Sequence, residues 1–258
     1  MVVGTSIAAV IVIVAVLIIV KVATNGSSTP HNTAAASGSI TSEVTSVPAS
    51  VLNQVAAGDA SGPRKTLTGA ALTSNGLPRV LYVGAEWCPY CAAERWALAV
   101  ALSRFGTLTH LGVTRSSSDD VDANTATLSF HGAHYTSKYV ALTADEIQDN
   151  AHKNLDSMTP GDSALFQSIS GGTFPFIDIA GKYYFSVQYD PAILGGSGMT
   201  QAQIARAIHD PSSAIAKAVD GSANVLTAAI CASTKNAPAA VCTSPGVVAA
   251  AKTLTSSS

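Results

Sequence analysis

The longest uninterrupted apolar stretch of the chain lies at its N-terminus. No residue from Val2 to Val20 is charged, and the part from Ile7 onward is almost wholly aliphatic. At about 1.5 Å per helical residue, this length matches the ~30 Å hydrocarbon core of a bilayer. A cleaved signal peptide usually has a basic start and a shorter apolar region, and this segment has neither. We therefore predict a transmembrane anchor over residues 1–22, in preference to a signal peptide or a buried core helix.

A polar segment follows the apolar one. Residues 23–62 are rich in Ser, Thr, Ala and Gly, and Asn25–Pro30 shows neither a helical nor a strand period. This composition is typical of a linker, and we expect residues 23–62 to tether a folded domain. Within the linker, the apolar residues of 48–57 share one face of a short helix, which either packs on the domain or stays free.

Strand-like and helical patterns alternate from residue 79 onward. Arg79–Gly84 is an apolar run of the length expected for a buried strand. Ala92–Phe105 contains no Gly or Pro and has the composition of a helix, which Gly106 ends. Leu108–Val113 predicts a second strand, and the polar residues 116–124 predict a loop.

The segment 125–150 has the pattern of an insertion between core elements. Leu128–Phe130 and Tyr135–Leu142 resemble strands. Thr143 and Glu146 have capping-box spacing, so we expect a helix to begin there.

A hairpin and several helices complete the pattern. Phe174–Ile179 and Tyr183–Val187 flank the turn residues 180–182, which predicts two antiparallel strands. The helices expected after this hairpin are Met199–Asp210, Ser213–Val219, Ala223–Cys231 and Pro245–Leu254.

Composition and charge narrow the classes of function. Only 12% of the 258 residues are charged and the net charge is −2, which argues against nucleic acid as a partner because phosphate backbones require a basic surface. Four cysteines in two pairs favour an oxidising, extracytoplasmic setting. Lys21, just after the apolar stretch, favours the opposite orientation, but a single lysine is a weaker signal than the cysteines. We expect a domain held outside the cytoplasm.

Cys88 and Cys91 carry the clearest chemistry in the sequence. They are separated by two residues at the point where a strand passes into a helix, so their sulfur atoms lie within bonding reach. The N–H groups at a helix start stabilise a thiolate, which is the attacking species in disulfide exchange. We therefore expect Cys88 to be the accessible nucleophile and Cys91 to be the resolving thiol.

Zinc sites and structural disulfides use the same spacing, so they remain alternatives for this pair. A zinc site of this kind needs a second close pair of ligands. Cys231 and Cys242 are separated by ten residues and have no adjacent histidine. His131 and His134 are three residues apart, where side chains of a strand face opposite sides, so we expect no metal site and no cofactor.

Val83-Gly-Ala-Glu-Trp-Cys-Pro-Tyr-Cys91 resembles the active-site strand, turn and helix of the thioredoxin superfamily. Cys-Pro-Tyr-Cys followed by Ala92–Trp96 is similar, more narrowly, to a little-characterised thioredoxin-like family known only as a domain of unknown function. The resemblance implies an α/β thioredoxin-like fold over residues 63–220, with an insertion between the second and third core strands and a small helical extension over 221–258. It also implies that Phe174–Pro175 is a cis-proline element facing the cysteines. The substrate-binding neighbours expected on this basis are Trp87, Pro89, Tyr90, Phe174 and Pro175.

The sequence also departs from thioredoxins. Tyr82 stands six residues before the first cysteine, where thioredoxins carry a buried acid used in proton transfer. The Pro-Tyr dipeptide is the one found in glutaredoxins and in some periplasmic disulfide isomerases. Glu86 and Glu94 lie close enough in sequence to relay protons, although solvated glutamates at a helix start are the simpler interpretation.

These observations together predict a membrane-anchored extracytoplasmic thiol–disulfide oxidoreductase. Its expected partners are the thiols or disulfides of exported proteins, or a partner redox protein. Two other functions stay open, a non-catalytic thioredoxin-fold binding module and a metal-delivery protein. For Cys231 and Cys242 we expect a structural disulfide that restrains a small helical unit, with a redox relay as the alternative.

Overall fold

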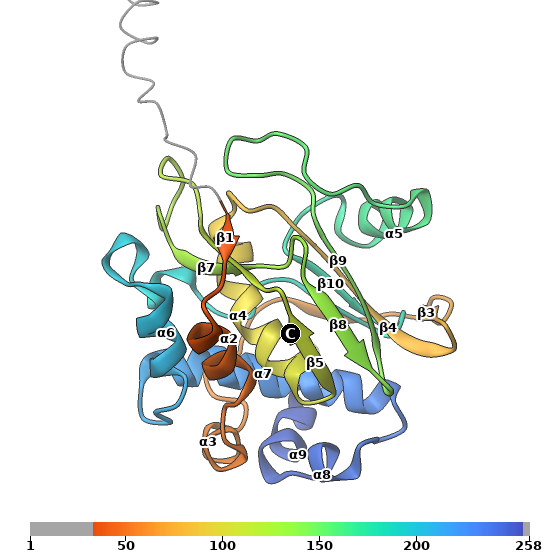
Figure 1. Ribbon diagram of the computed structural model, residues 1–258. Coiled ribbons are helices and arrows are strands. Elements are labelled where there is room, and N and C mark those ends of the chain that lie inside the picture. The colour runs from red at the N-terminus through yellow and green to blue at the C-terminus, as the bar shows by residue number, and fades with distance from the viewer. Residues whose placement is uncertain (1–32, 255–258) are drawn as a thin grey trace, which may run out of the picture. The chain divides into compact units, whose positions relative to one another are not determined.

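The computed structural model describes residues 33–254, so the expected membrane anchor over residues 1–22 lies outside the described residues (Figure 1). Within them the protein is a mixed α/β fold built on a six-stranded sheet in the order β2–β11–β10–β4–β3, to which β9 is added by pairing with β4. The strands of this sheet are β2 (Arg64–Thr66), β3 (Thr73–Ser74), β4 (Leu77–Gly84), β9 (Ala141–Glu146), β10 (Phe176–Ile179) and β11 (Tyr183–Phe185).

Strand β4 organises this sheet. It pairs in parallel with β9, in the register Gly84 opposite Glu146, and antiparallel with β10. Strands β10 and β11 form the hairpin predicted from the sequence, and the cis peptide Phe174–Pro175 leads into it. The carboxyl end of β4 therefore lies beside the end of β9 and the start of β10.

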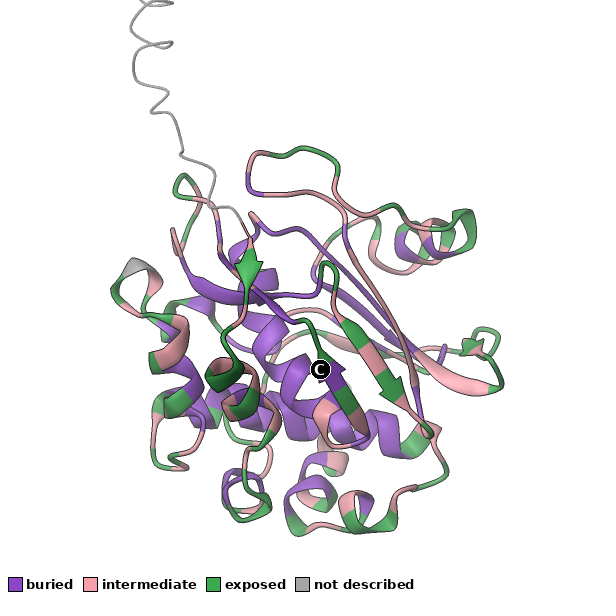
Figure 2. Ribbon diagram, in the orientation of Figure 1, coloured by how far each residue is buried: buried purple, intermediate pink, exposed green. Residues whose placement is uncertain are grey.

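The two faces of β4 contribute to different cores. Val80 and Tyr82 belong to the larger core, together with helices α4 (Pro89–Ser103) and α7 (Ala214–Ser233). Leu81 and Val83 belong to a smaller core with Phe166 of α5 (Pro160–Ser170), so α5 lies on the other side of the sheet (Figure 1). Figure 2 shows buried residues concentrated on α4, α7 and the neighbouring strands.

The insertion occupies a different place from the one expected. Four short strands lie between α4 and β9, so the insertion precedes the strand that pairs in parallel with β4 instead of following it. These strands are β5 (Gly106–Thr109), β6 (Gly112–Arg115), β7 (Ala126–Ser129) and β8 (His134–Ser137), with β6 also pairing with the short β1 (Ala34–Ala35).

Two local predictions in this region are wrong. Leu108–Val113 is not one strand, because His110 adopts a positive φ of 57° and separates β5 from β6. Thr143 does not begin a helix, because residues 143–146 pair with β4 as the end of β9. The parallel partner, which the local sequence does not reveal, outweighs the capping-box pattern.

The segment expected to be a tether is partly folded. Helices α2 (Gly38–Thr45) and α3 (Ala49–Val55) bury Val44 and Leu52 in the larger core, so the expected linker over 23–62 is wrong for residues 38–55. The short helix anticipated over 48–57 is present as α3. Asn224 of α7 donates hydrogen bonds to the carbonyl groups of Leu52 and Ala56, which fixes the end of α3 against the core.

The predicted boundary between a domain over 63–220 and a helical extension over 221–258 is wrong. Helix α7 runs without a break through position 221, where a side chain would collide with the backbone of Ala57, so no boundary separates 63–220 from 221–258. By length and composition α7 could cross a membrane, but 89% of its most apolar stretch is buried within the protein. It is followed by α8 (Ala239–Cys242) and α9 (Pro245–Ala251), while α6 (Gln201–Ala207) and the short helices Pro191–Leu194 and Gly196–Gly198 precede it.

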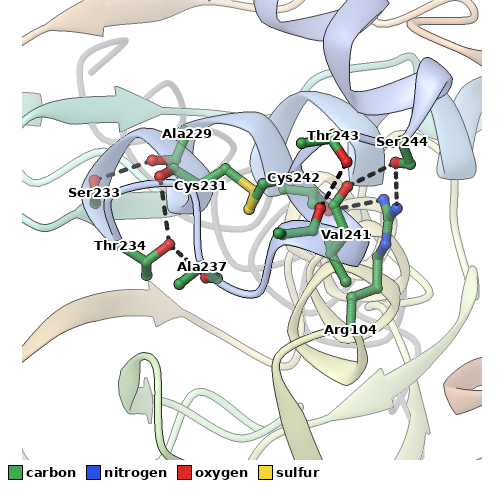
Figure 3. The surroundings of a disulfide bond; sticks show 12 residues. Arg104, Ala229, Cys231, Ser233, Thr234, Ala237, Val241, Cys242, Thr243 and Ser244 are labelled. Atoms are coloured by element: carbon green, nitrogen blue, oxygen red, sulfur yellow. Dashed lines mark hydrogen bonds between the residues drawn. A yellow bond between two sulfur atoms is a disulfide. The ribbon is translucent and has the colours of Figure 1, made fainter.

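A disulfide joins Cys231 of α7 to Cys242 of α8, as expected from the sequence, with Cα atoms 5.5 Å apart (Figure 3). Arg104, at the end of α4, donates a hydrogen bond to Ser244 just beyond this bridge. The C-terminal helical unit is thus attached to both long helices of the core.

Candidate functional site

Cys88 and Cys91 lie where the central strand enters the long buried helix. Strand β4 ends at Gly84, a three-residue turn follows, and Cys88 is the N-cap of α4. The backbone N–H of Cys91 donates to the sulfur of Cys88 at 3.2 Å, which is the usual geometry of an N-cap side chain. Both cysteines are free thiols, and Cys88 is 3% exposed whereas Cys91 is fully buried. The expectation of a solvent-accessible Cys88 is therefore wrong, because the turn and the start of α4 bury its side chain almost as fully as that of Cys91.

The two thiols differ more in their electrostatics than in their exposure. Burial raises the pKa of Cys88, but the hydrogen bonds from the side chain and backbone of Cys91, with the charge of Arg95, lower it by more, so the net direction is down. Burial raises the pKa of Cys91 well above its ordinary value, and its hydrogen bond to Cys88 raises it further. The arrangement therefore favours a thiolate on Cys88 beside a protonated Cys91.

A buried ion pair lies beneath the cysteine pair. Arg95 is one helical turn beyond Cys91, and its Nε and Nη2 atoms each donate to a carboxylate oxygen of Glu146 at 2.7 Å. Arg95 also donates from Nη2 to the carbonyl oxygen of Ala85, at 2.8 Å, in the turn before the cysteines. Neither partner of the pair is exposed. Sequence reasoning missed both residues as members of the site.

Tyr82 completes this buried layer. Its hydroxyl lies against Gly84, so a side chain at position 84 would displace the Tyr82 ring. Burial raises the pKa of Tyr82 well above its ordinary value, although the charge of Arg95 opposes the change. Tyr82 thus remains a neutral phenol at neutral pH and does not replace the acid of thioredoxins as a proton acceptor.

Aromatic side chains line one side of the cysteine pair. Trp87 contacts the rings of His152 and Phe174, with centroid distances of 4.6 and 5.4 Å, and donates from Nε1 to Gln148 at 3.0 Å. Phe174 packs on the small cluster formed by Ala85 and the two cysteines. The cis peptide to Pro175 follows, as the resemblance implied, so the expected neighbours Trp87 and Phe174 do meet at the site.

A cavity of about 360 Å³ is lined by Tyr90 but by neither cysteine. Tyr90 lies between the two cysteines in sequence and is 42% exposed, whereas its neighbour Pro89 is buried. The cavity is lined by Tyr90 together with Ser61, Gly62, Pro63 and residues 187–191. Tyr90 is therefore the residue that connects this cavity to the cysteine pair, through the chain.

The two glutamates near the cysteines are not solvated, which corrects the simpler of their two interpretations. Glu86 is 2% exposed and accepts hydrogen bonds from Ser129 and from Thr33, whose hydroxyl lies 2.6 Å from both carboxylate oxygens. Glu94 is fully buried and accepts from the backbone N–H of Gln188 at 3.0 Å. Burial raises the pKa of Glu94 to about 8, against the smaller opposing effect of that hydrogen bond.

The histidines singled out in the sequence lie elsewhere. His131 forms an ion pair with Asp156 at 2.7 Å, and His134 contacts the ring of His110. Across residues 33–254, no three side chains of the His, Cys, Asp or Glu type gather so that they could hold a metal ion.

Residues 65–171 match the family model described as Domain of unknown function (DUF929). The matched range includes both cysteines, Arg95 and Glu146, but it ends before Phe174. No curated protein and no solved structure matches the chain. The chain is similar to this family over the part that carries the cysteine pair and the ion pair beneath it.

Proposed function

We propose that this protein is a membrane-anchored thiol–disulfide oxidoreductase that works outside the cytoplasm, with Cys88 as nucleophile and Cys91 as resolving thiol. The observation that carries the proposal is the placement of two free thiols at a helix start, with Cys88 as the N-cap of α4 and its sulfur accepting a hydrogen bond from the backbone N–H of Cys91. The directions of the two pKa shifts, down for Cys88 and up for Cys91, agree with these roles. Thiol–disulfide exchange needs one thiolate that attacks the substrate and a second thiol that resolves the mixed disulfide.

The order of the elements supports a thioredoxin-like fold. Strand β4, helix α4, strand β9, helix α5, strands β10 and β11 and helix α7 follow one another along the chain. The first two strands pair in parallel and the last two are antiparallel, with α4 and α7 on one face and α5 on the other. This order and these layers resemble the core of the thioredoxin superfamily.

The proposed reaction is a pair of exchanges. The thiolate of Cys88 attacks a substrate disulfide, so a bond forms between Cys88 and one substrate sulfur while the other sulfur leaves as a thiolate. Cys91 then attacks Cys88, the mixed disulfide breaks, and the proton of Cys91 passes to the second departing sulfur. The substrate gains two electrons and the Cys88–Cys91 disulfide forms, and the reverse sequence oxidises a substrate dithiol.

The surroundings of the pair suit a protein substrate. Trp87 and Phe174 pack beside the cysteines, and Tyr90, between the two cysteines in sequence, lines a cavity. Aromatic surface next to a cavity is typical of sites that bind an extended segment of a partner. We propose exported proteins, or a partner redox protein, as the source of that segment.

Two observations support the location. Residues 2–20 have the length and composition of a transmembrane helix, and the Cys231–Cys242 disulfide is of a kind that persists in oxidising compartments. A domain that follows such a helix outside the cytoplasm would meet exported proteins as they fold.

The proposal is tested by single-turnover exchange. The full chain in detergent is reduced, freed of reductant, and mixed anaerobically with a disulfide-bonded protein. We expect one disulfide to form between Cys88 and Cys91 for each substrate disulfide lost, and Cys88→Ser to abolish the reaction. A wild-type protein that does not exchange would instead fit a binding module, and one that purifies with about one zinc or copper ion per chain would fit metal delivery.

A further inference from the structure

The ion pair beneath the cysteines leaves one edge of a guanidinium free. Glu146 accepts two hydrogen bonds from Arg95, through Nε and Nη2, and is itself held by the backbone N–H of Phe130. The remaining Nη1 atom of Arg95 is buried and has no hydrogen-bond partner among residues 33–254. The carboxylate thus occupies one edge of the guanidinium and leaves Nη1 without an acceptor.

The hydroxyl of Tyr82 is a second buried donor without an acceptor among residues 33–254. It is buried, and within the described part of the chain no acceptor takes its proton. It lies close enough to Arg95, Cys91 and Cys88 for their charges to affect it. The layer beneath the cysteines therefore contains two buried donors without acceptors, and such donors are costly unless an acceptor appears at some stage.

Arg95 is attached to the cluster that contains both cysteines, because its Nη2 atom donates to the carbonyl oxygen of Ala85, which packs with Cys88 and Cys91. The charge of Arg95 acts on both Cys88 and Cys91, whereas Glu146 is not among the main influences on either thiol. A sulfur that becomes a thiolate during exchange would supply the acceptor that the two donors lack. Other titratable groups near the pair include Tyr90 between the two cysteines, Glu86 on the preceding turn and His152, which lies against Trp87.

We infer that Arg95, oriented by Glu146, is a positioning residue that stabilises the thiolate form of the Cys88–Cys91 pair, with the Tyr82 hydroxyl as a second donor. This inference rests on the proposed function and assigns the role of the charge beneath the pair. Arg95 lies on α4 after the cysteines, so this cation would favour the thiolate directly and would accept no proton.

The test compares the pH dependence of Cys88 alkylation in full-length reduced protein, measured by mass spectrometry with iodoacetamide. The main variant is Arg95→Met with Glu146→Leu, which removes both buried charges together and leaves neither unpaired. The matched control is Arg79→Met with Asp162→Leu, because Arg79 and Asp162 form another two-bonded ion pair of the sheet, on the α5 side. Arg95→Lys keeps the charge, and Tyr82→Phe removes only the hydroxyl.

We expect alkylation of Cys88 at pH 7 to become about tenfold slower in Arg95→Met/Glu146→Leu, as the midpoint moves to higher pH. Arg95→Lys should stay within about threefold of wild type, Tyr82→Phe should be about threefold slower, and the Arg79 control should be unchanged. An unchanged profile in a folded Arg95→Met/Glu146→Leu protein overturns the inference. If that variant does not fold, the other two variants decide. The inference is overturned if the pH profile of Cys88 alkylation is unchanged in Tyr82→Phe and the alkylation rate at pH 7 falls more than threefold in Arg95→Lys.

Alkylation requires no substrate turnover, so the inference and the proposed function can fail separately. A wild-type protein that exchanges no disulfide, but whose Cys88 still loses reactivity when Arg95 is replaced, would refute the function and keep the role of Arg95. If the wild type exchanges disulfides, but the alkylation profile of Cys88 is unchanged when Arg95 and Glu146 are replaced, the function would stand and the role of Arg95 would be refuted.

Discussion

The backbone N–H of Cys91 donates a hydrogen bond to the sulfur of Cys88, at 3.2 Å, while both thiols are free. The same contact lowers the pKa of Cys88, while burial raises the pKa of Cys91. In the exchange that we propose, Cys88 would therefore be the better nucleophile and Cys91 would stay protonated until a mixed disulfide forms.

This asymmetry predicts which variant captures partners. Cys91→Ala should accumulate mixed disulfides with partner proteins, because the resolving thiol is gone, whereas Cys88→Ala should accumulate none. The measurement is a non-reducing gel of membranes that carry each variant, with and without dithiothreitol. Equal capture by both variants would show that the thiols are equivalent.

Replacing Tyr90 should affect protein substrates selectively. Because Tyr90 lines the cavity and is 42% exposed, Tyr90→Ala should raise KM for a disulfide-bonded protein by roughly 3- to 10-fold. Exchange with oxidised glutathione, which is too small to rely on that contact, should be unchanged. Val248→Ala, at an exposed apolar residue of α9, serves as the control and should alter neither reaction.

Stability should fall as the pH rises toward 8. Burial raises the pKa of Glu94 and of Asp220 to about 8 each, against the opposing hydrogen bond from Gln188 for the first and the charge of Arg104 for the second. The folded protein therefore keeps two protons that the unfolded chain releases near pH 4. The free energy of unfolding is thus highest at low pH and falls as the pH rises from 4 to 8.

Two protons released between pH 5 and pH 8 correspond to about 7 kcal/mol, so Tm of the wild type should be roughly 15 °C lower at pH 8 than at pH 5. Glu94→Gln with Asp220→Asn mimics the protonated forms and should remove most of that difference. Asp119→Asn, at an exposed loop residue, should retain the wild-type slope. A double variant whose Tm falls as steeply as that of the wild type would contradict the assignment.

The second cysteine pair should contribute stability and not turnover. Cys231→Ala with Cys242→Ala should lower the free energy of unfolding by about 2–4 kcal/mol, because the cross-link restrains the unfolded chain. Exchange by Cys88 should stay at the wild-type rate in the folded variant. A folded variant that has lost turnover would instead indicate that this pair relays electrons.

Local sequence patterns were sufficient for the part of the site that is continuous in sequence. The strand ending at Gly84, the helix after Cys88 and the hairpin after Pro175 each follow from apolar runs and turn residues within a few positions. The predicted contacts of Trp87 and Phe174 came from the family resemblance and not from any pattern in this chain.

The missed parts depend on contacts between distant segments. Glu146 pairs with Arg95 from 51 residues away, and only the parallel pairing of β9 with β4 reveals that the Thr143–Glu146 segment is a strand. Helix α5 was overlooked although Thr159 caps it, because few of its residues are buried and its apolar pattern is weak. The packing of α2 depends on Val44, which alone among its residues is fully buried.

The hydrogen bond from Thr33 to Glu86 has a mechanical consequence. Glu86 lies two residues before Cys88, and Thr33 is the first residue that the structure describes, immediately ahead of β1. The N-terminal end of the described domain is therefore attached at two neighbouring points, the turn that carries the cysteines and the strand β6 that pairs with β1. Any movement of β1 would displace Thr33 and so reach the turn before Cys88 through Glu86.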